Sequence, residues 1–557
     1  MGSTAAASNQ APGRDGSTRR FDAVIIGAGF AGMYAIHKLR KLGFSVLAIE
    51  AGTDVGGTWY WNRYPGARCD SESIEYSYSF SEELQQEWNW SERYATQPEI
   101  LRYINHVADR FDLRRDIQFR TRVTSAAYDE KANAWTVRTD KGEAITAQFC
   151  IAAVGCLSMP RVPDYKGIHD FKGIHYHTGA WPKEGVDFTG KRVAVMGTGS
   201  TGIQAIPVIA KQAKHLVVLQ RTPNFSLPAR NGVLDPEVVK KAKAHYADIR
   251  QRARYTAGGN TYIGDWVGTQ SALDVPEEER NAEYERRWQL GGAKMLVAYK
   301  DIAIDEAANK TAADFVRNKI RQTVKDPKVA ESLCPSDYPI GAKRICLDSG
   351  YFETYNRDNV TLIDLRKTPI TEFTAHSVRT TGGEYEIDCI VFATGFDAIT
   401  GTLLNIDFRG RDGLELKKKW EAGPRAYLGL QTAGFPNLFL VTGPGSPSVL
   451  STVMTSIEQH VDMITDCMQY MRERRMGTIE PQSAAEDAWV DHVNAVANTT
   501  LHVKANSWYL GANIPGKPRV FMPYIGGVGA YRRKCEEIVA KGYEGFTLGG
   551  AAKTAAA

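Results

Sequence analysis

Two glycine-rich segments of the 557-residue chain share one spacing, Gly-x-Gly-x-x-Gly. Glycine at these places permits a tight turn, close approach of the backbone to a pyrophosphate, and close packing of the helix that follows. Both segments therefore predict dinucleotide sites, although glycine-rich turns that bind nothing can show the same pattern. The residues concerned are Gly27, Gly29, Phe30, Ala31 and Gly32 in the first segment, and Gly197, Thr198, Gly199, Ser200, Thr201 and Gly202 in the second.

The residue that ends the next apolar stretch differs between the two segments. Glu50 ends it in the first, where a carboxylate can accept hydrogen bonds from a ribose 2′-hydroxyl. Arg221 and Thr222 stand there in the second, and a guanidinium matches a 2′-phosphate in charge and geometry. An arginine placed there for solubility is the alternative. We therefore expect one flavin dinucleotide and one nicotinamide donor, NADP in preference to NAD.

Each glycine segment lies inside a strand–helix–strand pattern. Apolar strands are predicted at 21–26, 45–50, 192–196 and 216–220, with helices at 33–41 and 203–212 between them. Further strands are predicted at 360–364, 385–393 and 437–442, and a further helix at 456–475. The pattern indicates an α/β fold with two Rossmann-like dinucleotide-binding domains, of which the first is interrupted by the second.

The stretch from 228 to 333 has a different composition. Asp235-Pro236, Pro276-Glu277 and Asp326-Pro327 are typical helix starts, and each is followed by Lys, Arg, Ala and Leu at helical spacing. We therefore expect a helical insertion here.

Composition excludes several other classes of protein. Lys and Arg number 68 against 64 Asp and Glu, so no strong basic field attracts nucleic acid. No run of 18 apolar residues predicts a membrane span. The eight cysteines form no Cys-x-x-Cys pair, which argues against a disulfide framework and a zinc site, and favours a cytoplasmic protein with no metal.

Four longer segments carry a family resemblance. Residues 171–182 fit Phe-x-Gly-x-x-x-His-x-x-x-Trp-Pro, and residues 56–66, 393–397 and 508–516 read GGTWYWNRYPG, ATGFD and WYLGANIPG. Together they resemble type I Baeyer-Villiger monooxygenases over nearly the whole chain after Phe21, and the phenylacetone and steroid branch more than the cyclohexanone enzymes. The resemblance implies that ketones of aryl, cyclic or steroid-like type are converted to esters or lactones with NADPH and O2.

The resemblance also implies a domain division. The FAD-binding domain is expected in two parts and the NADP-binding domain, with the helical insertion, between them. The expected boundaries are 1–20 (tail), 21–150 (FAD), 151–227 (NADP), 228–333 (insertion), 334–388 (NADP), 389–548 (FAD) and 549–557 (tail).

Two residues carry the chemistry in that resemblance. Such an enzyme must hold a C4a-peroxide of the reduced flavin and stabilise the negative charge of a tetrahedral adduct with the ketone, which requires a fixed cation. The resemblance assigns this role to Arg344 and a paired, supporting role to Asp70. From the residues alone, Arg344 reads as a surface arginine, and Asp70 cannot be chosen over Glu72 or Glu75.

The resemblance implies further cofactor contacts. Lys343 would reach the 2′-phosphate with Arg221 and Thr222, and Trp508 would close over bound NADP, a core tryptophan being the alternative. The segment 443–451 resembles the substrate-pocket loop, while His177 and Trp181 would couple domain positions and not act as a base. The residues implied at the flavin are Gly57, Thr58, Trp59, Tyr60, Asp70 and Tyr76, with Val123 near the adenine.

Other functions stay open on these residues. A heteroatom-oxygenating or NADPH-oxidase-like flavoprotein uses the same cofactors, and sulfoxidation fits the same chemistry. A flavin-binding redox sensor is less favoured because a sensor needs no cation at the flavin, and a disulfide reductase is disfavoured because the cysteines are unpaired. The expected partners are a ketone and O2, with no nucleic acid or membrane, in a monomer or weak oligomer.

Overall fold

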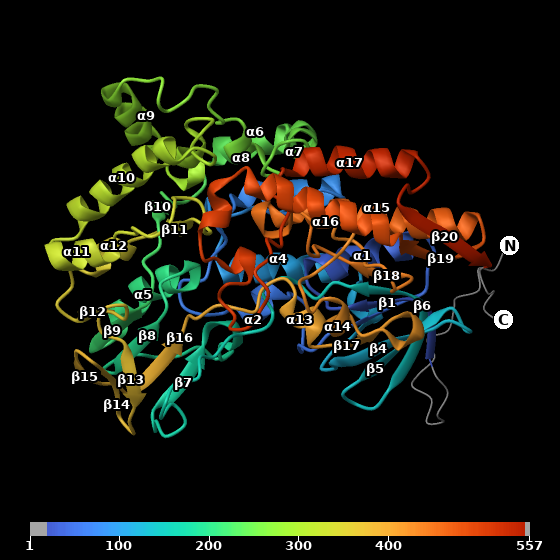
Figure 1. Ribbon diagram of the computed structural model, residues 1–557, viewed down its shortest axis with the longest axis horizontal. Coiled ribbons are helices and arrows are strands. Elements are labelled where there is room, and N and C mark those ends of the chain that lie inside the picture. The colour runs from blue at the N-terminus through green and yellow to red at the C-terminus, as the bar shows by residue number, and fades with distance from the viewer. Residues whose placement is uncertain (1–18, 552–557) are drawn as a thin grey trace.

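The computed structural model describes residues 19–551, and its larger sheet has eight strands (Figure 1). β1 lies parallel to β2 and β6, and α1 (Phe30–Lys41) connects β1 to β2, which confirms the strand–helix–strand prediction around the first glycine segment. The strand order is β17 (Asp407–Arg409), β4 (Val123–Asp129), β5 (Ala134–Thr139), β6 (Ala144–Ala152), β1 (Arg19–Ile26), β2 (Val46–Ile49) and β3 (Ile117–Gln118), with β18 (Leu438–Leu440) paired to β6.

The second sheet has five strands, all parallel. Its order is β12 (Val360–Asp364), β9 (His215–Gln220), β8 (Arg192–Met196), β16 (Cys389–Phe392) and β7 (Ile174–His177). α5 (Ser200–Gln212) connects β8 to β9 and begins inside the second glycine segment, so that prediction is confirmed as well. Both glycine segments thus lie where a parallel strand ends and a helix begins.

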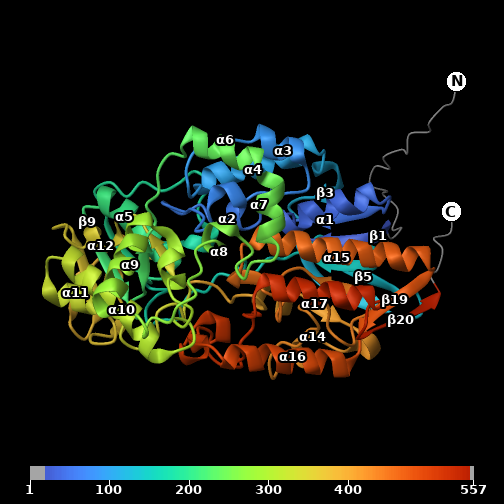
Figure 2. The same cartoon turned by 90° about the horizontal axis from the view of Figure 1, so that it is seen from above.

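The stretch between β10 (Ser226–Pro228) and β11 (Cys346–Asp348) is helical, as predicted. Asp235 and Asp326 cap two of its helices by accepting backbone hydrogen bonds at the N-terminus. In Figure 2, α6 and α7 lie next to α3 (Glu82–Glu87) and α4 (Gln97–Arg110), whereas α9 to α11 lie at the end of the molecule that carries α5. The helices are α6 (Pro236–Ala244), α7 (Tyr246–Ala253), α8 (Thr261–Gly264), α9 (Glu277–Leu290), α10 (Glu306–Thr323) and α11 (Pro327–Leu333).

The C-terminal part returns to the eight-stranded sheet. α15 (Val453–Glu473) packs along α1, and α17 (Val528–Ala540) packs along α15. Apolar side chains of α1, α4 and α15 form one continuous core with those of the sheet. The remaining elements are α2 (Thr58–Trp61), α12 (Tyr351–Thr354), α13 (Gly401–Leu404), α14 (Leu416–Lys419), α16 (Ser483–Asn498), β13 (Ile370–Phe373), β14 (Ser377–Thr380), β15 (Gly383–Glu386), β19 (Met476–Pro481) and β20 (Phe546–Ala551).

Three predictions about element and segment limits need correction. Residues 19 and 20 belong to β1, and residues 549–551 belong to β20, which pairs with β19, so neither expected tail is as long as predicted. Residues 1–18 and 552–557 lie outside the described part. The strand expected at 385–393 is two strands, because β15 pairs with β14 in a separate antiparallel sheet while β16 joins β7 and β8.

The position of β16 also changes one expected boundary. All four of its side chains are buried, and it runs parallel to β8 in the middle of the five-stranded sheet. The division at residue 389 therefore separates this strand from the sheet to which it belongs. Within residues 19–551, no helix combines the length and the apolar character that crossing a lipid bilayer requires.

Candidate active site

Arg344 and Asp70 form a two-pronged ion pair. Arg344 lies just before β11, and its Nε and Nη2 donate to the two carboxylate oxygens of Asp70 at 2.9 and 2.6 Å. Its Nη1 donates to the carbonyl oxygen of Val449 at 2.6 Å, within the loop expected to border the substrate. Three distant segments therefore meet at one guanidinium, whose direction is fixed by all three bonds.

The surroundings keep this guanidinium charged. Asp70 raises the pKa of Arg344 above its already high value. Burial raises the pKa of the Tyr509 hydroxyl to about 12, against the opposing effect of Arg344, and raises the pKa of the Cys69 thiol to about 12. Apart from the Asp70 carboxylate, these neighbouring groups are neutral, so the guanidinium stays a permanent cation that can stabilise developing negative charge.

The first glycine turn leaves room for backbone contact with a ligand. Gly27 has φ +104°, and a Cβ there would lie 2.6 Å from the carbonyl oxygen of Ala153. Gly57 has φ +52°, and its Cβ would lie 2.9 Å from the Cα of Gly29. A side chain at either place would collide with neighbouring backbone, so only glycine allows the turn to pack this closely, as the pyrophosphate site of FAD requires.

Glu50 lies beside this turn, as its spacing predicted. Its two oxygens accept from the backbone N–H groups of Ala28 and Gly52 at 2.8 and 2.6 Å, and burial raises the pKa of the carboxyl. Thr121 donates its backbone N–H to the carbonyl oxygen of Glu50, which brings the start of β4, with Val123, to the same end of the sheet. A ribose contact for Glu50 and an adenine contact for Val123 stay predictions.

The aromatic residues expected at the flavin follow directly after the turn. Gly57 precedes α2, which starts at Thr58. The indole N–H of Trp59 donates to the Tyr76 hydroxyl at 3.0 Å, and Gln97 donates to the Trp59 carbonyl oxygen. These three residues form one buried group.

Tyr60 points to a different neighbour. Its hydroxyl accepts from the backbone N–H of Thr53 at 2.9 Å, and the Lys183 ammonium lies 4.8 Å from the ring centroid. These contacts lower the pKa of the Tyr60 hydroxyl, although burial opposes them.

The second glycine turn has the same geometry. Gly197 has φ +109°, and a Cβ there would lie 2.4 Å from the carbonyl oxygen of Ala393. Thr198 donates its hydroxyl to the carbonyl oxygen of Thr222 at 2.9 Å, which holds the loop after β9 against the turn. The Ser200 hydroxyl lies 3.2 Å from the Cys346 sulfur, two positions from Arg344. The residues of this turn fit the pyrophosphate of NADP.

Cations gather beyond this turn. Arg221 is exposed, while the Lys343 ammonium lies 4.3 Å from the centroid of the Tyr338 ring. Burial and the nearby Arg221 lower the pKa of Lys343, and the same two causes lower the pKa of Arg161. Sequence reasoning missed Arg161, because no pattern in the residues around it signals a phosphate contact.

The loop that carries Trp508 is tied to the segment after β16. Lys517 donates to Asp397 at 2.5 Å, and Asn513 donates to the carbonyl oxygen of Phe396 at 2.8 Å. Trp508 itself is half-buried, and its ring centroid lies 4.4 Å from that of Tyr509. The loop is therefore positioned next to the Arg344 pair, whereas closure of Trp508 over NADP stays a prediction.

The ring nitrogens of His177 form hydrogen bonds with backbone groups. Its Nδ1 accepts from the N–H of Gly179 at 2.9 Å, so Nε2 carries the hydrogen and donates to the carbonyl oxygen of Arg161 at 3.2 Å. Burial lowers the pKa of the ring, which favours this neutral form. Trp181 is buried against Tyr176 and Phe188 in the core beside the five-stranded sheet.

Tyr262 is a second residue that sequence reasoning missed. It lies in α8 of the insertion, its hydroxyl is 3.4 Å from that of Thr452, and it raises the pKa of Arg344 through space. Only the folded chain brings the insertion to this site, so no local signal could have identified it.

Comparison with known proteins places the chain in a family. Residues 24–257 match the family described as pyridine nucleotide-disulphide oxidoreductase. A Baeyer-Villiger monooxygenase of Pseudooceanicola batsensis is 46% identical over 94% of this chain and 95% of its own length. Phenazine N-monooxygenase PhzNO1 of Lysobacter antibioticus is 43% identical over 96% of this chain and 98% of its own length.

Two solved structures share the whole fold. Oxidized steroid monooxygenase bound to NADP has a TM-score of 0.91 and 54% identity, over 95% of this chain and 99% of that one. Cyclohexanone monooxygenase from Rhodococcus sp. Phi1 bound to NADP+ has a TM-score of 0.93 and 44% identity, over 96% of this chain and 100% of that one. The predicted fold class is confirmed. Sequence identity is higher to the steroid monooxygenase than to the cyclohexanone monooxygenase, in line with the expected branch, whereas the TM-score is slightly higher for the cyclohexanone monooxygenase. At 46% identity to a Baeyer-Villiger monooxygenase over 94% of its length, the chain belongs to the Baeyer-Villiger monooxygenase family.

Proposed function

We propose that this protein binds FAD, takes electrons from NADPH, and uses O2 to insert one oxygen atom beside the carbonyl carbon of a ketone, giving an ester or a lactone. The observation that carries the proposal is the two-pronged Arg344–Asp70 pair. Arg344 lies two positions from Cys346, whose sulfur is 3.2 Å from the Ser200 hydroxyl in the second glycine turn. When bound, the reduced flavin supplies the activation of O2.

The chain's own residues supply the fixed charge. Arg344 offers a cation that does not lose its proton near neutral pH, and Asp70 and the Val449 carbonyl oxygen hold its plane in one orientation. A negative oxygen that develops on the substrate is stabilised by this preorganised group without reorganisation. Asp70 is a supporting residue, because both its oxygens are engaged by Arg344.

The cofactor sites are proposed on the two glycine turns. Gly27, Gly29, Phe30, Ala31, Gly32 and Glu50 would hold the adenosine diphosphate of FAD, with Gly57, Thr58, Trp59, Tyr60, Asp70 and Tyr76 at the flavin and Val123 at the adenine. Residues 197–202 would hold the pyrophosphate of NADP, Arg221, Thr222 and Lys343 its 2′-phosphate, and Trp508 would close over it.

We propose the domain division with the changes that the strands require: residues 19–20 join the first FAD-binding part, residues 549–551 join the second, and one internal boundary moves. The strand at 389–392 is assigned to the NADP-binding domain, because it pairs inside the five-stranded sheet, and the second FAD-binding part begins after it. We also propose a cytoplasmic location and a monomeric or weakly oligomeric state. The eight unpaired cysteines support the location.

Aryl, cyclic and steroid-like ketones are the proposed substrates. The similarity to structures described as steroid and cyclohexanone monooxygenases supports this range. The test is aerobic turnover of phenylacetone, a cyclic ketone and a steroid ketone with NADPH under ¹⁸O2. One labelled oxygen in an ester or lactone product supports the proposal, whereas NADPH oxidation that yields only hydrogen peroxide across the panel contradicts it.

A second candidate is oxygenation of nitrogen or sulfur. The 43% identity to phenazine N-monooxygenase PhzNO1 favours it, because that protein shares nearly the full length of this chain. The same assay with phenazines, tertiary amines and sulfides separates the candidates. N-oxides or sulfoxides without any ester would establish the second function in place of the first.

A further inference from the structure

Asp337 is an acidic residue beside the cations proposed for the 2′-phosphate. It directly precedes Tyr338, whose ring lies under the Lys343 ammonium at 4.3 Å. Burial and Arg221 lower the pKa of Lys343, and the nearby Asp337 opposes this lowering. A free carboxylate at this place would pair with Lys343 or Arg221 and compete with a phosphate for them.

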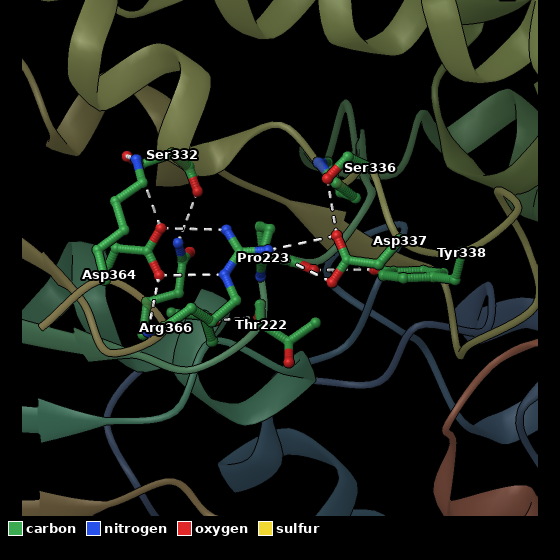
Figure 3. A network of polar contacts seen from close by, with 12 residues as sticks. Thr222, Pro223, Ser332, Ser336, Asp337, Tyr338, Asp364 and Arg366 are labelled. Carbon is green, nitrogen blue, oxygen red and sulfur yellow. Dashed lines mark hydrogen bonds and ion pairs between the residues drawn. The ribbon is translucent and has the colours of Figure 1, made fainter. Parts of the chain in front are cut away.

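Arg366 holds this carboxylate. Its Nη1 lies 3.3 Å from both oxygens of Asp337, and the Ser336 hydroxyl donates to one of them at 2.7 Å. On its other side Arg366 donates through Nε and Nη2 to Asp364, at 3.1 Å each. Figure 3 shows the guanidinium between the two carboxylates, with Thr222 and Pro223 close by.

The backbone places Arg366, which lies between Asp337 and Asp364, next to Arg221. Asp364 ends β12 and lies opposite Gln220, the last residue of β9. The N–H of Leu365 donates to the carbonyl oxygen of Gln220 at 2.8 Å, so Arg366 and Arg221 follow two hydrogen-bonded neighbours. The side chain of Asp364 is only 6% exposed, which anchors Arg366 firmly, whereas that of Asp337 is 50% exposed and has room to turn.

The two cations, by contrast, lack carboxylate partners of their own. No ion pair to Arg221 or Lys343 is present within residues 19–551, although 41 others are. The carboxylate of Asp337, one residue before Tyr338, is hydrogen-bonded to Arg366 instead.

We propose that Arg366 is a positioning residue for coenzyme specificity, which keeps Asp337 away from Arg221 and Lys343 and so leaves both cations free for the 2′-phosphate of NADPH. The inference rests on the proposed 2′-phosphate site. Removal of Arg366 would release Asp337 toward these cations, and the preference for a 2′-phosphate would fall.

The test uses the FAD-loaded protein and two ligands that differ only by that phosphate, 2′,5′-ADP and 5′-AMP, with calorimetric titration at fixed salt. Arg366→Ala is expected to weaken 2′,5′-ADP about fivefold and to change 5′-AMP less than twofold. Adding Asp337→Asn to Arg366→Ala should restore 2′,5′-ADP to within twofold of the unaltered protein, since an amide does not neutralise the cations.

Other outcomes overturn the proposal. Equal losses for both ligands in Arg366→Ala, or a double variant as weak as the single one, would show that Arg366 acts through general structure. Asp337→Asn alone keeps both hydrogen bonds between Arg366 and Asp364, so weaker binding of 2′,5′-ADP by this variant would also contradict the proposal. Failure of the underlying site has a separate signature, namely an unaltered protein that binds both ligands equally and an Arg221→Ala variant that changes neither.

Discussion

The guanidinium of Arg344 and the carboxylate of Asp70 meet through two parallel hydrogen bonds, although 274 positions separate the residues in the chain. The third donor of Arg344 reaches the Val449 carbonyl oxygen, a further 105 positions along. The pair therefore forms only when all three segments are folded together. Substitutions at Arg344 and Asp70 can separate the effect of the charge of this pair from the effect of its shape.

Arg344→Ala should abolish oxygenation of ketones while flavin reduction by NADPH continues. Without the cation, negative charge on the substrate oxygen loses its stabilising partner, and loss of one such donor typically costs about 100- to 1000-fold in rate. Anaerobic bleaching of the flavin absorbance measures reduction, and product analysis measures oxygenation. Arg344→Lys is the matched control, because it keeps the charge but lacks the planar fork. Its rate of oxygenation should lie between those of Arg344→Ala and the unaltered protein. Ester formed by Arg344→Ala at the normal rate would contradict the assigned role.

Asp70→Asn should slow oxygenation about 10- to 100-fold, because the amide keeps the size of the side chain but not the charge that orients Arg344. Glu72→Gln is the control. Glu72 lies two residues away and pairs with Arg93 and Lys294, so its loss should lower stability but leave the ratio of ester formed to NADPH consumed unchanged. If Asp70→Asn and Glu72→Gln gave the same ratio of ester formed to NADPH consumed, Asp70 would have no part in oxygenation.

The combined variant Arg221→Ala/Lys343→Ala should lose its preference for NADPH. Two charge-assisted contacts to one phosphate are removed, and an increase of about 100-fold in the KM for NADPH is expected. NADH lacks the phosphate and serves as the internal control, so its KM should change less than threefold. A parallel loss for both coenzymes in steady-state assays would show that the cations hold another part of the ligand.

Much of the fold follows from local patterns. Glycine spacing, apolar strands and Asp-Pro helix starts predicted the two strand–helix–strand units and the helical insertion, because each of these signals is read within about 20 residues. The second dinucleotide unit, inserted after β6, was visible for the same reason. The prediction of a single strand at 385–393 was wrong. The stretch is apolar enough for one strand, yet the chain turns at Asp388, whose carboxylate accepts hydrogen bonds from Arg192.

The site could be predicted only through the resemblance. Asp70, Glu72 and Glu75 are equivalent as isolated carboxylates, and the fold separates them by giving each a different partner. Arg161 and Tyr262 have no signal in the sequence, since their relation to Arg221 and Arg344 arises from contacts between segments far apart. Contacts between segments of different domains, and not sequence composition, bring these residues to the site.

Glu75→Ala should lower the free energy of unfolding by about 1–3 kcal/mol, the cost of leaving buried donors without an acceptor. Glu75 is 4% exposed and accepts from the backbone N–H of Thr261, the Thr261 hydroxyl and the N–H of Tyr262, which docks the insertion on the FAD-side segment. Thr261→Val removes one donor and should cost less. Urea unfolding of the two single variants and the double variant checks this, and strictly additive effects would contradict a shared clamp.

Asp348 should make stability fall as the pH rises from 5 to 8. Burial raises the pKa of this carboxyl from 3.8 to about 7, although it accepts the backbone N–H of Tyr351. The folded protein therefore keeps a proton over the range in which the unfolded chain has already released it, and stability declines with pH wherever the folded state binds more protons. Nearby Glu353 acts in the same direction, and Arg230 opposes it.

Asp348→Asn tests this sign, because the amide keeps an acceptor for Tyr351 and has no proton to lose. Relative to the unaltered protein, the variant should gain on the order of 2 kcal/mol between pH 5 and pH 8, seen as a rising difference in Tm. Asp358→Asn, at an exposed aspartate nearby, is the control and should give the same difference at both pH values. If Asp348→Asn also gave a constant difference, Asp348 would be ionised in the folded protein throughout this range, and the Tyr351 hydrogen bond would outweigh burial.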